Sequence, residues 1–205
     1  MRRMQRLHPP NELDTVAPVL PATKEHVRAF TAFVLEHAAE SGQDGMPPHA
    51  LQPDRSGEEV EAVALERWSR PLTSPRWGRA WLLWSGPLPA AGPAGFHDPG
   101  ARVVGHVELQ GGRIGAELHR ATLGIGLLSA YRGQGHGRRL MQAAIDWARG
   151  EAGLDHVDLG VFVGNDRAKR LYVSMGFVEI GVRHDAFRVD GRSVDDIEMT
   201  LALRA

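Results

Sequence analysis

The sequence predicts an α+β (α/β-like) fold in which a single mixed β-sheet is flanked by helices. Two helical patterns come first: Thr23 can cap one helix, and a capping box of Ser56 and Glu59 opens the next. After them, short apolar strands are mixed with two further helices, and the chain ends in two strands around the turn Asp190-Gly191. This order of elements is typical of one sheet with helices packed against it.

The individual elements follow from apolar periodicity and from residues that start or stop a helix. Strands are expected at 16–22, 79–86, 101–110, 118–129 and 156–163, and helices at 135–149 and from Asn165 to Gly176. Segments 40–55 and 85–100 are rich in turn-forming residues, so we expect loops there, the second of them mobile.

Length and composition are those of an ordinary globular protein. The 205 residues suffice for one domain with a buried core, and we expect 1–15 to be a disordered tail and 16–205 to form that domain. A net charge of −1 gives no nucleic-acid or membrane signature, and the absence of cysteine excludes disulfides, thiolate metal sites and a cysteine nucleophile. Without a signal peptide or an apolar span, the expected location is the cytoplasm.

The stretch "SAYRGQGHGRRL" (129–140) follows a predicted strand and opens a predicted helix. Gly133, Gly135 and Gly137 allow a ligand to approach the backbone, and the free N–H groups and dipole of the helix start suit a phosphate. Arg138 and Arg139 stand where a P-loop needs Lys and Ser or Thr, and the glycine spacing does not fit the dinucleotide-binding pattern. A flexible turn with solvated arginines is the alternative interpretation.

Two motifs, "RGQGHG" (132–137) and "NDRAKRLYVSMGF" (165–177), together resemble those of the GCN5-related N-acetyltransferase (GNAT) superfamily. "RGQGHG" (132–137) matches its pyrophosphate loop Arg-x-x-Gly-x-Gly. "NDRAKRLYVSMGF" (165–177) carries every anchor of its second pattern, Asn-x-x-Ala-x-x-x-Tyr-x-x-x-Gly-Phe. The resemblance covers about residues 16–204. It implies a GNAT fold with splayed central strands around the pantetheine arm, and transfer of an acetyl group from acetyl-CoA to a primary amine by direct attack in a ternary complex, without a metal.

By this resemblance, the coenzyme lies along the glycine turn and the strand before it. Main-chain N–H groups of 133–138 would bind the pyrophosphate, with arginines adding charge-assisted contacts, and the end of the strand would pair with the pantetheine arm. Asn165 would contact the same arm, or would act only as a helix N-cap. The residues expected at the coenzyme are Leu127, Leu128, Ser129, Arg132, Gly133, Gln134, Gly135, His136, Gly137, Arg138 and Asn165.

Tyr172 matches the residue that protonates the departing thiolate in the superfamily. A tyrosine with a pKa of about 10 is protonated at neutral pH and can donate a hydrogen bond as charge develops on a thiol of pKa about 8.5. Water could deliver the final proton. Core packing is the alternative, because Tyr172 lies one helical turn from Ala168.

The attacking amine must lose a proton, and the sequence leaves the base open. The branch that modifies ribosomal-protein N-termini carries a glutamate five residues before the motif asparagine, where this chain has Gly160. We rank Glu108 and His119 first as candidate bases, ahead of Glu117 and His106, and a histidine pKa near 6.5 suits the task. Each could instead be a solvated loop residue or a structural histidine.

The acceptor is inferred from the overall pattern. Residues 103–109, 117–137 and 187–203 resemble the branch that acetylates free amino acids or similar small amines, with the acceptor pocket formed by the region 24–80. Protein N-termini, antibiotics or polyamines are alternative acceptors, and a non-catalytic acyl-CoA-binding regulatory protein and a different acyl group also stay open. We expect acetyl-CoA and a small amine as partners, no nucleic acid, membrane or metal, and leave a homodimer open.

Overall fold

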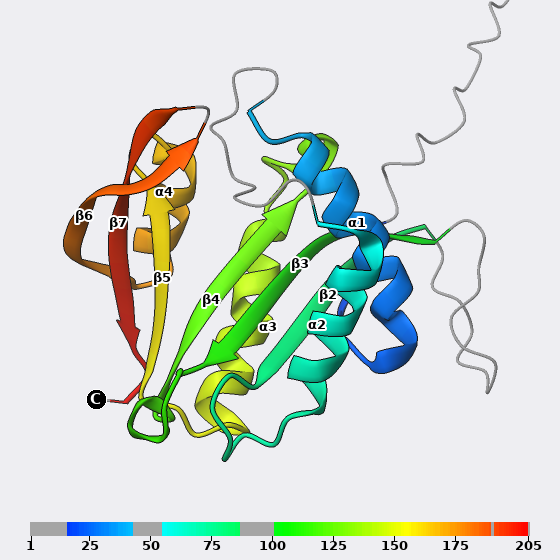
Figure 1. Cartoon of the computed structure of the whole chain (residues 1–205), viewed down its shortest axis with the longest axis horizontal. Coiled ribbons are helices and arrows are strands. Elements are labelled where there is room, and N and C mark those ends of the chain that lie inside the picture. The colour runs from blue at the N-terminus through cyan, green and yellow to red at the C-terminus, as the bar shows by residue number, and fades with distance from the viewer. Residues whose placement is uncertain (1–15, 43–54, 87–100, 190, 205) are drawn as a thin grey trace, which may run out of the picture.

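The computed structural model describes residues 16–42, 55–86, 101–189 and 191–204. They form one seven-stranded sheet in the order β1-β2-β3-β4-β5-β7-β6 (Figure 1). The strands are β1 (Val16–Pro21), β2 (Gly78–Ser85), β3 (Arg102–Gly111), β4 (Arg120–Leu127), β5 (His156–Phe162), β6 (Val178–Val189) and β7 (Arg192–Ala202). The helices are α1 (Val27–Ala39), α2 (Gly57–Ser69), α3 (His136–Gly150) and α4 (Asp166–Ser174), with short 3-10 turns η2 (Lys24–His26), η3 (Gly115–Glu117) and η4 (Ser129–Tyr131).

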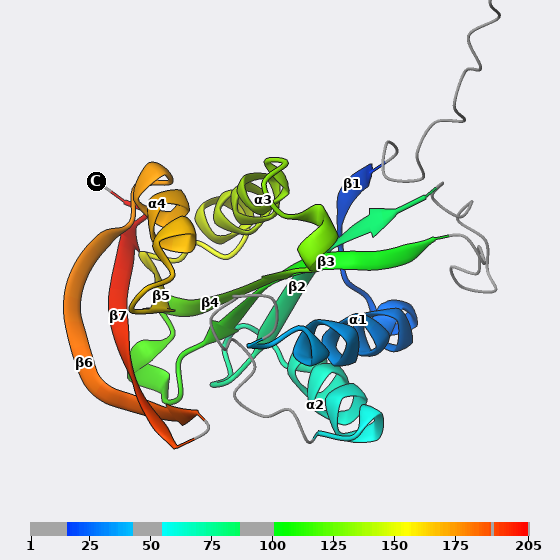
Figure 2. The ribbon, with the colours of Figure 1, turned by 90° about the horizontal axis from the view of Figure 1, so that it is seen from above.

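The sheet is mixed, as the sequence predicts. Neighbouring strands pair antiparallel throughout, except β4 and β5, which run parallel. Helices α1 and α2 cover one face of the sheet, and α3 and α4 cover the other (Figure 2). The tail expected at 1–15 and most of the loops expected at 40–55 and 85–100 lie outside the described residues.

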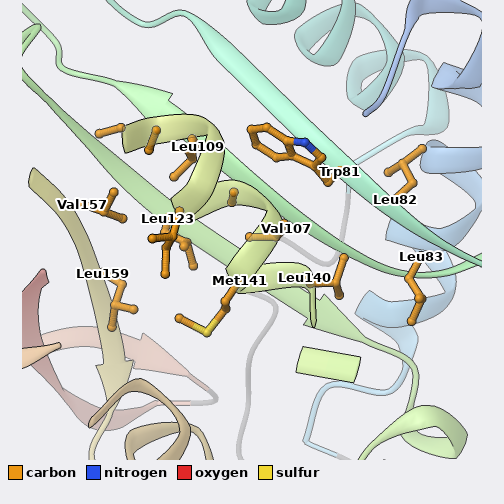
Figure 3. Close-up of a cluster of buried hydrophobic side chains, with 14 of the residues drawn as sticks. Trp81, Leu82, Leu83, Val107, Leu109, Leu123, Leu140, Met141, Val157 and Leu159 are labelled. Carbon is orange, nitrogen blue, oxygen red and sulfur yellow. The ribbon is translucent and has the colours of Figure 1, made fainter. Parts of the chain in front are cut away.

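The core between the sheet and α3 positions the start of that helix. Leu140 and Met141 of α3 are fully buried against apolar residues of the central strands (Figure 3). Those strand residues include Trp81, Val107, Leu109, Leu123, Val157 and Leu159. Burying side chains of this size contributes about 1.5–3 kcal/mol each, so α3 is held firmly and its first turn is fixed relative to β4.

The final hairpin is confirmed. Val189 pairs with Arg192 at the end of a long antiparallel ladder between β6 and β7. Gly191 has φ 74°, the left-handed conformation that two-residue hairpin turns require. Asp190, its expected turn partner, lies outside the described residues.

One predicted strand is too long. The expectation of a strand at 118–129 is wrong at both ends, because β4 covers only Arg120–Leu127. His119 lies in the turn before the strand, and Ser129 begins the 3-10 turn η4 after it. Alternation of apolar residues did not reveal that the chain leaves the sheet after Leu127.

The parallel pair β4–β5 separates along its length. Only Arg120, Ala121 and Thr122 pair with β5, opposite residues 156–158. Beyond that point the strands diverge toward their carboxyl ends, as Figure 1 shows. The resemblance implied splayed central strands, and the sheet has them.

Candidate active site

The divergence of β4 and β5 opens a cavity of about 340 Å³, which we call the β4–β5 slot. Its lining comes from the end of β4, the glycine turn, the first turn of α3 and one side of α4; it includes His37, Ile125, Gly126, Leu127, Arg132, Gly133, Gly135, Gly137, Arg138, Asn165, Arg167, Ala168, Leu171 and Tyr172. Both sequence motifs therefore meet in one cavity.

Beyond its pairing with β5, the backbone of β4 faces this slot. Leu128 N donates to Val104 O at 3.0 Å, so the even-numbered residues of this segment direct their backbone groups toward β3. Because backbone groups alternate between the two sides of a strand, Ile125 and Leu127 direct their N–H groups toward the gap left by β5, as does the C=O group of Ile125. The C=O group of Leu127 accepts from Arg132 Nε at 2.8 Å. A linear molecule in the slot can continue the sheet along this edge.

Two of the three residues expected at the strand end have their backbone N–H groups bonded to other protein groups. Leu127 lines the slot, but Leu128 is buried and its N–H is used by Val104. The Ser129 N–H donates to the Glu40 carboxylate at 2.9 and 3.0 Å, and the Ser129 hydroxyl donates to it at 2.8 Å. The physical reason is the end of β4 at Leu127, which turns the chain into η4.

The glycine turn has the geometry that the motif predicts. Gly133 and Gly135 have φ 84° and 85°, where a side chain is strained. The first intrahelical bond of α3 is Arg139 N to Gly135 O at 3.3 Å, so the N–H groups of 136–138 precede it and carry the positive end of the helix dipole. Gly137 permits close packing, since a Cβ there would lie 3.0 Å from Leu171 Cδ2.

The arginines of the turn do not act as expected. Arg132 donates from Nε to Leu127 O at 2.8 Å and from Nη2 to Glu40 at 3.0 Å, and burial lowers its pKa. Arg138 donates to Ser174 Oγ at 2.6 Å, so it joins α3 to α4. Their first role is therefore to fix the walls of the slot, although Arg132 Nη1 is buried without a hydrogen-bond partner and fits an oxygen of a bound group.

Sequence reasoning missed the arginine that is available to a ligand. Arg167, in the first turn of α4, reaches over the glycine turn: a Cβ at Gly133 would lie 2.8 Å from its Nη2. It makes no ion pair among the described residues, and its charge lowers the pKa of Arg132. Arg167 occupies a variable position of the second motif, so only the packing of α4 beside the turn identifies it.

The side chain of Gln134 bonds to the protein backbone, and that of His136 is buried. Gln134 Nε2 donates to Ala130 O at 2.9 Å. His136 is buried, and burial, with the charge of Arg139, lowers its pKa. Their backbone N–H groups remain the basis for placing them at a phosphate.

Helix α4 brings the second motif to the slot. Asn165 Oδ1 accepts a hydrogen bond from Ala168 N at 3.2 Å, so Asn165 caps the helix and also lines the slot. Tyr172 is 7% exposed and lines the slot as well. Burial raises the pKa of Tyr172 to about 12, so its phenol is protonated at every physiological pH.

A second cavity of about 750 Å³ lies against the sheet on the side of α2, and we call it the α2-side cleft. It begins where β4 and β5 separate, at Thr122 and Gly160, and extends to Arg67 and Arg76. Charged side chains line much of it; these are Arg67, Arg76, Arg113, Glu117, Arg120, Asp158, Arg183, Asp196 and Glu198.

Comparison with known proteins identifies the family. A sequence model of the acetyltransferase (GNAT) family matches residues 62–177. The chain belongs to this family. N-alpha-acetyltransferase RimI of Mycobacterium tuberculosis is 45% identical over 67 residues, which are 33% of this chain and 40% of that protein.

Solved structures agree on the fold. The acetyltransferase of the GNAT family from Streptococcus pneumoniae has a TM-score of 0.70 at 20% identity, and covers 92% of this chain and 99% of its own. The structure of yncA from Salmonella typhimurium, with acetyl-CoA, has a TM-score of 0.70 at 19% identity and covers 94% of this chain and 96% of its own. The predicted single mixed sheet is therefore the GNAT fold.

The two candidate bases ranked first, Glu108 and His119, do not line the β4–β5 slot. Glu108 on β3 accepts from Gln110 at 3.0 Å and borders Gly124, but it lines neither cavity. His119 precedes β4 beside His156, with ring centroids 6.2 Å apart. It lines neither the β4–β5 slot nor the α2-side cleft.

The other two candidate bases, His106 and Glu117, have different surroundings. His106 is half-buried between Phe30 and Phe33, at ring-centroid distances of 5.4 and 5.2 Å, and desolvation lowers its pKa. Glu117 lines the α2-side cleft.

Among the described residues, no group of three or more His, Cys, Asp or Glu could hold a metal ion, and no helix is long and apolar enough to span a bilayer.

Proposed function

We propose that the protein transfers an acetyl group from acetyl-CoA to the primary amine of a small molecule, such as an amino acid. The observation that carries this proposal is the β4–β5 slot, which opens on a glycine turn at a helix N-terminus. The free N–H groups of 136–138 and the Arg167 guanidinium suit a pyrophosphate, and the free edge of β4 suits the amides of a pantetheine arm.

Tyr172 acts in this proposal as a hydrogen-bond donor to the leaving sulfur. Transfer of a proton from a phenol with a pKa of about 12 to a thiolate of ordinary pKa, near 8.5, is unfavourable by about 5 kcal/mol of free energy. A hydrogen bond donated while charge develops on the sulfur does not require this proton transfer, and water can supply the final proton. The hydroxyl has no hydrogen-bond partner among the described residues, so it is available for this role.

A second acceptor class is the N-terminal amine of a protein. The 45% identity to RimI over 67 residues favours it. The small-molecule acceptor is preferred because Gly160 replaces the glutamate expected of the branch that modifies protein N-termini. Both classes share the donor side and differ only in the acceptor.

The test is release of free thiol from acetyl-CoA in the presence of amino acids, polyamines, aminoglycosides or N-terminal peptides. The chain has no cysteine, so every thiol detected comes from coenzyme A. We expect amine-dependent release that falls about 100-fold in Tyr172→Phe, the magnitude typical of a lost donor at a developing anion. Tyr131→Phe is the matched control, because Tyr131 is the only other tyrosine, is equally buried and does not line the slot.

Two results would contradict different parts of the proposal. Equal rates in Tyr172→Phe and Tyr131→Phe would remove Tyr172 from the reaction while leaving the transferase in place. Absence of release with every amine, together with a melting temperature that still rises on addition of acetyl-CoA, would indicate a binding protein that does not turn over.

A further inference from the structure

A carboxylate from β7 occupies the space above Gly160 on β5. A Cβ at Gly160 would lie 2.5 Å from Asp196 Oδ2 and 2.9 Å from Oδ1, closer than any side chain can approach. The absence of a side chain at Gly160 is therefore what allows the carboxyl group of Asp196 to lie against the strand.

Asp196 is buried but incompletely paired. It is 5% exposed and lines the α2-side cleft. Arg183 Nη2 donates to Oδ2 at 3.2 Å, while Oδ1 has no hydrogen-bond partner among the described residues. Arg183 is itself half-exposed and also lies 3.9 Å from Glu198, so the compensation of the buried charge is partial.

The location of Asp196 suits a reacting amine. Thr122 pairs with Asp158, and Gly124 and Gly160 follow two residues later on the two sides of the gap between the strands. Neither glycine has a side chain to close the gap from the α2 side. The cleft that contains Asp196 thus begins about three residues, or ~10 Å, from the point where Ile125 starts the slot.

We propose that the α2-side cleft binds the acceptor and that Asp196 receives its primary ammonium group and takes one proton from it. This inference rests on the proposed acetyl transfer. Asp196 accepts one of the three ammonium protons, and the nitrogen lone pair forms a C–N bond to the thioester carbonyl carbon. The C–S bond breaks, the sulfur leaves with the electron pair, and a second nitrogen proton reaches the thiolate through water. The third stays on the amide, and Asp196 releases its proton to solvent.

The opposite end of the cleft selects a second group on the acceptor. Arg120 is held by Asp158 at 2.6 Å, and Arg113 and Arg183 also have carboxylates within 4 Å. Arg67 and Arg76 form no ion pair among the described residues.

Arg76 also has φ 60°, a conformation that non-glycine residues seldom adopt without a local reason. Two guanidiniums without a carboxylate in direct contact fit an anion. The acceptor class is therefore a small molecule with a primary ammonium at one end and a carboxylate at the other.

The first experiment compares Asp196→Asn with Asp195→Asn, the neighbouring acid that does not line the cleft and bonds His184 at 2.8 Å. We expect kcat/KM to fall at least 100-fold at pH 7 in Asp196→Asn and less than threefold in the control. The rise in melting temperature with acetyl-CoA should persist in both. Equal activity of the two variants would overturn the role of Asp196 without affecting the proposed transfer.

A pH profile separates proton transfer from a structural role. The charged groups that face Asp196 are Arg183 of β6 and Glu198 of β7. Without the aspartate, only amine that is already neutral can react, so kcat/KM of Asp196→Asn should rise tenfold per pH unit toward the pKa of the acceptor. Its deficit relative to the wild type should shrink accordingly. A deficit that stays constant with pH would overturn the assignment.

The second experiment tests the acceptor class with amines of matched length. We expect kcat/KM for ω-amino acids to exceed that for diamines of equal chain length at least tenfold, and Arg67→Gln combined with Arg76→Gln to abolish the difference by raising KM alone. Diamines that react as well as amino acids in the wild type would overturn the anionic end of the site. Acetylation of no amine at all would instead contradict the proposed function.

Discussion

The β4–β5 slot and the α2-side cleft meet where two strands separate, yet they are built from different chemistry. The slot presents glycines, apolar side chains and the backbone edge of β4. The cleft presents five arginines and four carboxylates. Backbone groups are the same whatever the side chains, so the slot suits a constant partner, whereas the cleft can be changed residue by residue.

Charged residues also have different tasks in the two regions. In the slot, Arg132 and Arg138 are occupied by protein groups and hold the walls together. In the cleft, Arg67 and Arg76 make no ion pair within 4 Å among the described residues, although the charges of both lower the pKa of Glu66. A charged residue in a sequence motif can therefore be structural, while one outside any motif is available to bind a ligand.

The largest effect should come from removing the buried guanidinium of the slot. Arg132→Met leaves Glu40 without its cation and Leu127 O without its donor, and we expect a loss of about 3 kcal/mol in the free energy of unfolding. Arg138→Met, from the same motif but exposed, should lose less than 1 kcal/mol. Urea unfolding measures both. Equal stability of the two variants would mean that Arg132 is not structural.

A smaller effect should come from Arg167, the exposed arginine over the glycine turn. We expect Arg167→Gln to raise KM for acetyl-CoA about tenfold, the value of one charge-assisted hydrogen bond, without change in KM for the amine. The free energy of unfolding should stay within about 0.5 kcal/mol of the wild type. Arg170→Gln, one turn further along α4 and outside the slot, should change neither quantity. An unaltered KM for acetyl-CoA in Arg167→Gln would mean that Arg167 does not bind the phosphate.

The local parts of the site could be predicted from sequence because they depend on short-range rules. The glycine turn, the N-cap at Asn165 and the placement of Tyr172 on α4 all follow from residues within one motif. The fold class followed from the order of elements. These features need no knowledge of which strands pair.

The parts that failed depend on contacts between distant segments. Glu40 lies 92 residues before Arg132, so nothing in the motif indicates their pairing. Asp196 reaches Gly160 only through the β5–β7 register, and a shift of one residue would point it to the other face. The predicted strand at 118–129 began two residues before β4, because the start of a strand is poorly marked by apolar alternation.

The smallest predicted effects contrast two carboxylates of the α2-side cleft. Burial alone would raise the pKa of Asp158, but hydrogen bonds from Arg120 and Thr200 outweigh it and hold that pKa below its usual range. Burial raises the pKa of Asp196, and Arg183 only partly offsets it. The first carboxylate therefore stabilises the fold above its unfolded pKa, near 3.9, and this contribution is lost as the pH falls through its lower folded value. The contribution of Asp196 to the free energy of unfolding has the opposite sign. Its ionisation opposes folding as the pH rises through the unfolded and then the folded pKa.

At pH 7, Asp158→Asn should therefore lower the free energy of unfolding by about 1 kcal/mol, and Asp196→Asn should raise it by up to about 1 kcal/mol. Both differences from the wild type should diminish at pH 3, where the unfolded carboxyls are protonated; urea unfolding at the two pH values measures this. A loss of stability in Asp196→Asn would mean that its bond to Arg183 outweighs burial, and that Asp196 is kept for the fold. A gain would show a buried charge maintained at the expense of stability, which is expected of a residue that serves the reaction.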